Sequence, residues 1–271
     1  MNTERKGYDP FTAIRKVPLY AEDGMQSRAY SVAHQQYIQS KESTVTFNTK
    51  WLESGVVGKD YLLIPNEELK DMCEEIQTFT PYDFSVDKLW FNGSQFVMSY
   101  ITETLTRDIS PGDAVGLGMM VENSYDQSRA AGFSLFAYRL VCTNGMIAPT
   151  YFSRRRFRHS PKSNKWQDEI RAAASLIADA PDSMDKFADT LRGLSVSRLE
   201  TNDVALIRNQ YLDRLGHAHW GKIMDKYLEG DQYTAFGMLN ACTNEFWHKK
   251  HTTASDFYHN KYCVESMMTY A

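Results

Sequence analysis

The chain has 271 residues, a formal net charge of −4, and 42% hydrophobic and 13% aromatic residues. This apolar content is sufficient for a packed core and excludes the composition of an intrinsically disordered chain. No run of about 18 apolar residues is present, and the polar segment 1–18 lacks the apolar centre of a signal peptide. We therefore expect a cytoplasmic protein that makes no contact with a membrane.

The first 43 residues carry weak structural signals. The pairs Asp9-Pro10 and Val17-Pro18 favour extended or turn conformations, and the glutamine-rich segment 31–40 is a candidate short helix. We expect residues 1–43 to form an N-terminal arm.

Residues 44–160 are predicted to form an antiparallel sheet with one helix. The helix begins at Pro65 or Asn66, has two glutamates in its first turn, and ends near Phe79. The pair Asn92-Gly93 predicts a β-hairpin, because both residues readily adopt positive φ. The predicted strands are 89–91, 95–102, 113–121, 132–142 and 151–159, with a polar loop at 122–130.

Residues 161–271 are predicted to form a C-terminal helical region that packs on the sheet as one domain. Apolar residues recur there at helical spacing, and Gly193 and Gly216 are candidate helix terminators. The predicted helices are 166–179, 181–193, 201–215, 221–228, 233–249 and 255–270. Strands followed by helices predict an α+β fold.

A local cluster of cations stands out in this acidic chain. Between Tyr151 and Trp166 there is no carboxylate, and Phe152 and Phe157 are interleaved with the basic residues. The cations are Arg154, Arg155, Arg156, Arg158, Lys162 and Lys165. Arginine pairs well with phosphate oxygens and aromatic faces stack on unpaired bases, so single-stranded nucleic acid is the leading candidate partner.

The predicted strand would align part of this cluster. Alternation places Arg154, Arg156 and Arg158 on one face, about 6.6 Å apart, where the three side chains can follow a phosphate backbone. Tyr151, Phe157 or Trp166 would then stack on bases. The structural alternative is a solvated edge strand, in which cations prevent aggregation or pair with the protein's own carboxylates.

Other constellations give weaker indications of chemistry. Asp113, Glu122 and Asp126 are a candidate carboxylate cluster for a metal-dependent nuclease, and the late pair His248 and His251 could share a helix face. No complete metal motif is present, and the four cysteines lie far apart with no C-x-x-C pair. We expect no catalytic residue, metal or cofactor.

Several strings resemble one family. Residues 123–128 read NSYDQS, residues 138–145 read YRLVCTNG, and Phe157-Arg158-His159 and Leu239-Asn240-Ala241-Cys242-Thr243 follow in order. They resemble the phage and plasmid proteins grouped as domain of unknown function 932, over about residues 50–255. Gln127 departs from the glycine usual in that family. The resemblance implies no catalytic residues, and its order of sheet then helices is loosely similar to Rad52-like single-strand annealing proteins.

These observations lead to one expected function with one alternative. We expect a phage-encoded protein that binds single-stranded DNA, with RNA still open, and that promotes annealing as a homo-oligomer. The alternative is a non-enzymatic phage protein that binds a host transcription, replication or defence protein.

Overall fold

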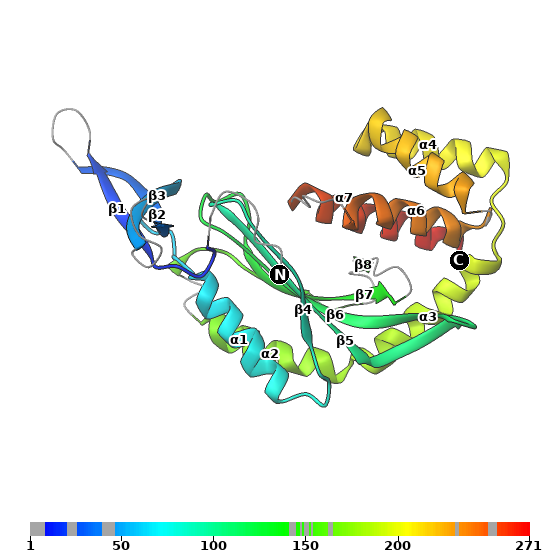
Figure 1. Ribbon diagram of the computed structural model, residues 1–271, viewed down its shortest axis with the longest axis horizontal. Coiled ribbons are helices and arrows are strands. Elements are labelled where there is room, and N and C mark those ends of the chain that lie inside the picture. Colours follow the sequence, from blue (N-terminus) through cyan, green and yellow to red (C-terminus); the bar gives the residue numbers. More distant parts are fainter. Residues whose placement is uncertain are drawn as a thin grey trace. The chain divides into compact units, whose positions relative to one another are not determined.

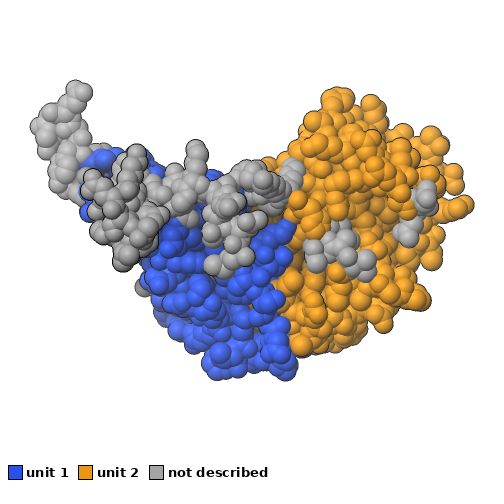
Figure 2. All heavy atoms as spheres, viewed as in Figure 1, with its two compact units in different colours: residues 1–100, 120–134, 154–176 blue, residues 101–119, 135–153, 177–271 orange. Residues whose placement is uncertain are grey.

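The computed structural model describes residues 9–20, 26–39, 47–140, 145–146, 148, 152, 154–161, 165–230, 233–248 and 254–271. The chain divides into two compact units, each built from three separate segments (Figure 2). Unit 1 comprises residues 1–100, 120–134 and 154–176, and unit 2 comprises residues 101–119, 135–153 and 177–271. The interleaving arises because three long strands contribute residues to both units. The expected division at residues 43 and 160 stays a prediction.

The elements follow the predicted order of strands and then helices (Figure 1). The strands are β1 (Ile14–Tyr20), β2 (Gln26–Gln39), β3 (Phe47–Gly58), β4 (Ser85–Phe91), β5 (Gln95–Ser110), β6 (Asp113–Ser124), β7 (Ala131–Arg139), β8 (Gly145–Met146) and β9 (Arg154–Phe157). The helices are α1 (Asn66–Thr78), α2 (Trp166–Ala178), α3 (Ala180–Val196), α4 (Thr201–Leu215), α5 (His217–Glu229), α6 (Ala235–Trp247) and α7 (Ala254–Met267), followed by the short 3-10 helix η2 (Met268–Tyr270). The predicted α+β class is confirmed.

Three N-terminal strands form a sheet, which corrects the expectation of a short helix at 31–40. β1, β2 and β3 pair antiparallel in that order, and residues 31–39 of the glutamine-rich segment lie within β2. Pairing with β3 along its length, from Ala29 opposite Gly58 to Gln39 opposite Phe47, supplies backbone partners that local helix propensity cannot foresee. Pro18 is accommodated because β1 is an edge strand of this sheet.

The second sheet has the order β4-β5-β6-β7-β8, and β9 also pairs with β7. The predicted hairpin between β4 and β5 is confirmed. The Asn92 side-chain oxygen accepts hydrogen bonds from the backbone N–H groups of Ser94 and Gln95, and Gly93 has φ of 98°. The turn chemistry of the pair Asn92-Gly93 therefore sets the register of these two strands.

The predicted loop 122–130 begins three residues too early. β6 continues through Glu122, Asn123 and Ser124, all of which are buried. These polar residues resemble a turn in sequence, but hydrogen bonds engage them in the strand. The Asn123 side-chain amide donates to the Ile64 carbonyl and to the Asn66 side chain, both at 2.8 Å, while its Oδ1 has no partner among the described residues. Burial of a polar residue in a strand is tolerated when most of its hydrogen bonds are made.

The C-terminal helices are largely as predicted. A capping box between Glu200 and Asp203 begins α4, and Gly216, with φ of 80°, ends it. The 13-residue helix α6 is the most deeply buried, with Phe246 and Trp247 in the core. Within the part of the chain that the structure describes, no helix is both long and apolar enough to cross a membrane.

Candidate nucleic-acid interface

The predicted basic strand exists, but it is short. β9 spans only Arg154–Phe157 and pairs antiparallel with β7, where Gly132 lies opposite Arg156 and Ser134 opposite Arg154. Among the described strands β9 has no partner on its other edge. Arg155 and Arg156 are exposed, Arg154 is half-buried, and Phe157 is buried. The strand therefore presents cations to solvent along an edge of the sheet.

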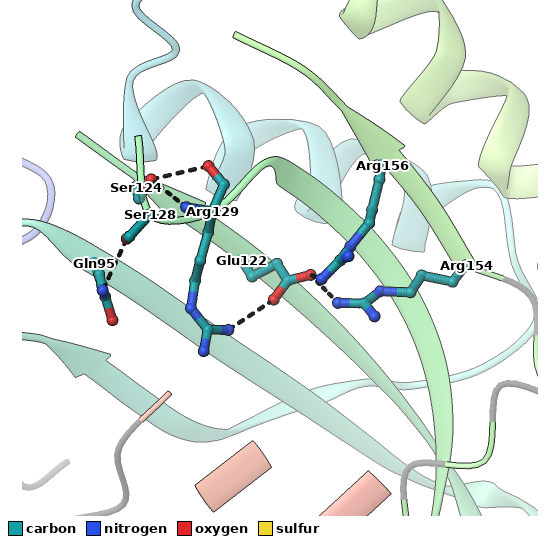
Figure 3. A network of polar contacts seen from close by, with 7 residues as sticks. All are labelled: Gln95, Glu122, Ser124, Ser128, Arg129, Arg154 and Arg156. Carbon is teal, nitrogen blue, oxygen red and sulfur yellow. Dashed lines mark hydrogen bonds and ion pairs between the residues drawn. The ribbon is translucent and has the colours of Figure 1, made fainter. Parts of the chain in front are cut away.

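A buried carboxylate organises the cations of this region. Glu122 on β6 has a side chain only 5% exposed, and three arginines converge on it (Figure 3). Arg129 Nη1 lies 3.1 Å from one carboxylate oxygen, Arg156 Nη2 lies 3.5 Å from the other, and Arg154 Nη2 donates to that second oxygen as well. We call these four residues the Glu122 cluster. All four belong to unit 1.

Gly132 makes the convergence possible. It lies in β7, between β6 and β9, and a Cβ at this position would be 3.2 Å from Glu122 Oε1 and 3.1 Å from the Arg155 carbonyl oxygen. With no side chain on Gly132, the Glu122 side chain crosses β7 to reach the arginines of β9. A glycine inside a strand often marks such a close approach.

A tight loop positions the third arginine. Ser124 Oγ donates to the Arg129 carbonyl at 2.9 Å and accepts from the Arg129 backbone N–H at 3.0 Å. Ser128 in the same loop accepts a hydrogen bond from the Gln95 side chain at 2.8 Å (Figure 3). These contacts fix the backbone of Arg129, so its guanidinium needs little rearrangement to reach Glu122.

Positive charge is in excess at this site. Three guanidinium groups face one carboxylate, which leaves a surplus of two positive charges. The side chains of Arg129 and Arg154 are each 20% exposed, whereas that of Arg156 is 53% exposed. Among the described residues, neither Arg155 nor Arg158 has a carboxylate within 4.0 Å. Such a site favours an anion with several oxygen acceptors.

The expected row of three free guanidiniums needs correction. Arg154 and Arg156 share the face predicted for them, but both contact Glu122, and Arg158 lies beyond the end of β9. The sequence could not foresee the neutralising carboxylate, because Glu122 lies 32 residues before Arg154 and reaches it only across β7. Arg155, Arg158 and Lys165 are exposed as expected.

The expected stacking rings also need correction. Phe157 and Trp166 are buried, with 2% and 4% of their surfaces exposed, so neither offers a face to a base. Aromatic residues in a short amphipathic strand or at a helix start more readily serve the core, which is where these two lie. Tyr151 and Lys162 fall outside the described residues.

The candidate metal ligands are engaged elsewhere. Asp113 forms a two-point pair with Arg139, at 2.6 and 2.7 Å, and Asp126 accepts from the Ser128 backbone N–H. Over the described ranges, no three His, Cys, Asp or Glu side chains come together to hold a metal ion. His251 falls outside these ranges.

Glu122 and Arg129 are the members of the site that sequence reasoning missed. Glu122 was expected in a loop, as a solvated acid or a metal ligand. The sequence offers no clear signal for it, because β6 is buried at almost every position and no alternation marks Glu122.

Comparison with known families gives one match. A model of the family described as Domain of unknown function (DUF932) matches residues 53–267. The chain belongs to this family. No curated protein and no solved structure shows significant similarity to the chain. The likeness to Rad52-like annealing proteins is not shown by these comparisons and stays a prediction.

The strings shared with the DUF932 family are largely architectural in this member. Tyr125 is buried and its hydroxyl accepts from the Asn66 backbone N–H at 2.9 Å, at the start of α1. Gln127 has φ of 66°, a conformation that glycine adopts more freely than other residues. The Gln127 side chain compensates in part by donating to the Val56 carbonyl at 3.0 Å.

The later strings also have structural roles. Tyr138 donates to the Thr102 carbonyl at 2.9 Å, and its ring lies against Gly116, where a Cβ would come within 2.7 Å. His159 stacks on Tyr61 with ring centroids 4.5 Å apart, and its Nδ1 lies 2.9 Å from the Leu62 carbonyl oxygen. Tyr125, Tyr138 and His159 of these strings thus have packing and hydrogen-bonding roles in the structure.

Proposed function

We propose that this protein binds single-stranded DNA through its phosphates, at the exposed edge of β9. The observation that carries the proposal is the surplus of two positive charges in the Glu122 cluster, beside Arg155 and Arg158. An acidic chain that concentrates cations at one edge strand creates a local attraction for a polyanion. RNA carries the same phosphates and is a second substrate to test.

The mode of contact follows from the side chains available. Exposed guanidiniums engage phosphate oxygens, and the three described aromatic residues of the basic stretch, Phe152, Phe157 and Trp166, are buried. The bases of a bound strand would therefore remain free to pair. Free bases support strand annealing as the activity that this binding serves. We propose that an assembly of several copies promotes it. Annealing requires no general acid, general base or nucleophile.

Fluorescence anisotropy with labelled oligothymidylate tests the binding. The double variant Arg155→Gln with Arg158→Gln removes two exposed cations without touching Glu122, and we expect about 10-fold weaker binding at low salt. The matched control is Arg171→Gln with Arg208→Gln. Arg171 lies on α2 and Arg208 on α4, and both are exposed. The control lowers the net charge of the chain by the same amount.

The two variants separate local from global electrostatics. Equal affinity of both variants, or no binding by the wild-type protein at low salt, would remove the proposal. A stoichiometric protein partner recovered from lysate, together with no binding of oligonucleotide, would favour the alternative of a protein-binding factor.

A further inference from the structure

The Glu122 cluster contains a buried donor that no described residue engages. Arg154 Nε is buried and has no hydrogen-bond partner among the described residues. The Nη2 group of the same side chain donates to Glu122. A buried N–H group on a charged side chain is costly to leave unpaired, so an oxygen acceptor from outside the chain is expected there.

The charges around this donor indicate the kind of acceptor. Three arginines present far more N–H groups than the two oxygens of Glu122 can accept. A neutral water could satisfy Arg154 Nε, but it would leave the surplus of two positive charges in place. A partly buried surplus of this size is best relieved by an anion that accepts several hydrogen bonds at once.

We infer that the Glu122 cluster is a binding site for one phosphate group, with Arg154 as its innermost donor and Arg156 as its exposed donor. Glu122 acts as a positioning residue, because its carboxylate holds the three guanidiniums together when the site is empty. The site rests on the proposed function where its ligand is a backbone phosphate of the bound strand. A free phosphate ion has the same chemistry and is the second source.

The geometry of β9 separates this site from the remaining cations. Arg154 and Arg156 lie on the face of the strand that is turned toward Glu122, whereas Arg155 alternates to the other face. Arg158 lies beyond the end of β9 and has no contact with Glu122 within 4.0 Å, so Arg155 and Arg158 can attract a strand without entering the cluster. The two sets of arginines can be tested independently.

Thermal unfolding in phosphate, against sodium chloride at equal ionic strength, tests the site in the full-length protein. We expect the unfolding midpoint of the wild-type protein to rise with the logarithm of the phosphate concentration, once that concentration exceeds the dissociation constant of the site. Arg154→Gln should weaken phosphate binding by about 10- to 100-fold, the usual loss when a charged hydrogen bond is removed. Arg171→Gln is the control, because Arg171 also pairs with a carboxylate, that of Glu75, but lies on α2 outside the Glu122 cluster.

A second variant protects the test from a simple failure to fold. Glu122→Gln keeps the shape of the side chain, removes its negative charge and frees the arginines, so phosphate affinity should rise roughly 10-fold. A purely structural role for the cluster predicts lower stability with no gain in phosphate affinity. No phosphate-dependent shift in the wild-type protein, or an unchanged shift in both variants, would overturn the site.

The same samples distinguish the two sources of phosphate. If oligothymidylate abolishes the phosphate-dependent shift, the strand places a backbone phosphate in the cluster. If phosphate stabilises the protein but oligothymidylate does not bind, the site stands and the proposed function fails. If oligothymidylate binds with equal affinity to the wild-type protein and to Arg154→Gln, while phosphate has no effect, the proposed function stands and the site fails.

Discussion

At the residue scale, His159 is a half-buried histidine whose contacts favour one protonation state. A carbonyl oxygen can only accept, so Nδ1 carries the proton that is donated to Leu62, and Nε2 is the unprotonated nitrogen. Nε2 is buried and has no hydrogen-bond partner among the described residues. Burial lowers the pKa of His159, while the hydrogen bond to Leu62 partly opposes this effect.

This environment predicts a pH dependence of stability. Because the pKa of His159 is lower in the folded than in the unfolded state, the unfolded chain binds more protons below about pH 6.5. The contribution of neutral His159 to stability is therefore intact above pH 6.5 and is lost as the pH falls toward the folded pKa. Urea unfolding at pH 7.5 and pH 5 should show a larger decrease for the wild-type protein than for His159→Phe, which retains a ring against Tyr61. Equal decreases would show that another group controls this pH range.

At the element scale, the pairing of β7 with β9 depends on a residue without a side chain. A Cβ at Gly132 would be 3.1 Å from the Arg155 carbonyl oxygen, which belongs to the backbone of the partner strand and cannot rotate away. The same Cβ would press on the Glu122 carboxylate. Both the pairing of β7 with β9 and the Glu122 cluster therefore require that residue 132 has no side chain.

We expect Gly132→Ala to destabilise unit 1 by about 1–2 kcal/mol, as overpacking in a tight site does. Gly58→Ala is the matched control, because Gly58 also lies in a strand of unit 1 but has nothing within 4 Å of its hypothetical Cβ. That control should be neutral or slightly stabilising, since alanine reduces the entropy of the unfolded chain. Urea midpoints compare the two, and an equal effect of both variants would argue against close packing at Gly132.

At the scale of the whole molecule, the overall charge opposes the proposed function and the local charge supports it. A chain with a net charge of −4 repels a polyanion at long range, so binding must come from close contacts with the cations of β9. Salt affects both the long-range repulsion and the close contacts. It screens the repulsion between the acidic chain and the polyanion, and its ions compete with each direct contact between a cation and a phosphate.

The salt dependence of oligothymidylate binding should therefore reveal how many cations take part. Each phosphate neutralised on a single strand contributes about −0.7 to the slope of log affinity against log salt. Contacts by Arg155, Arg156, Arg158 and Lys165 predict a slope of roughly −3, and Arg155→Gln with Arg158→Gln should reduce it to roughly −1.4. A slope near zero for the wild-type protein would indicate that phosphates are not the contact.

Local patterns in the sequence determined most of the elements. The pair Asn92-Gly93 specified its hairpin, the acidic residues at Glu200 and Asp203 begin α4, and Gly216 ends it. Each of these signals acts over a few residues, through backbone φ or a nearby hydrogen bond, and can therefore be recognised without knowledge of the fold. The density of arginine in residues 154–158 is likewise a property of the sequence alone.

The tertiary structure decided what those arginines contact. Glu122 resembles a loop residue in sequence because the run 122–124 is polar, and only the order β6-β7-β9 brings its carboxylate to Arg154 and Arg156. The glutamine-rich segment of β2 became a strand for the same reason, since its partner β3 is separate in sequence. Strand order and register are long-range properties, so they settle which charges are paired and which remain for a ligand.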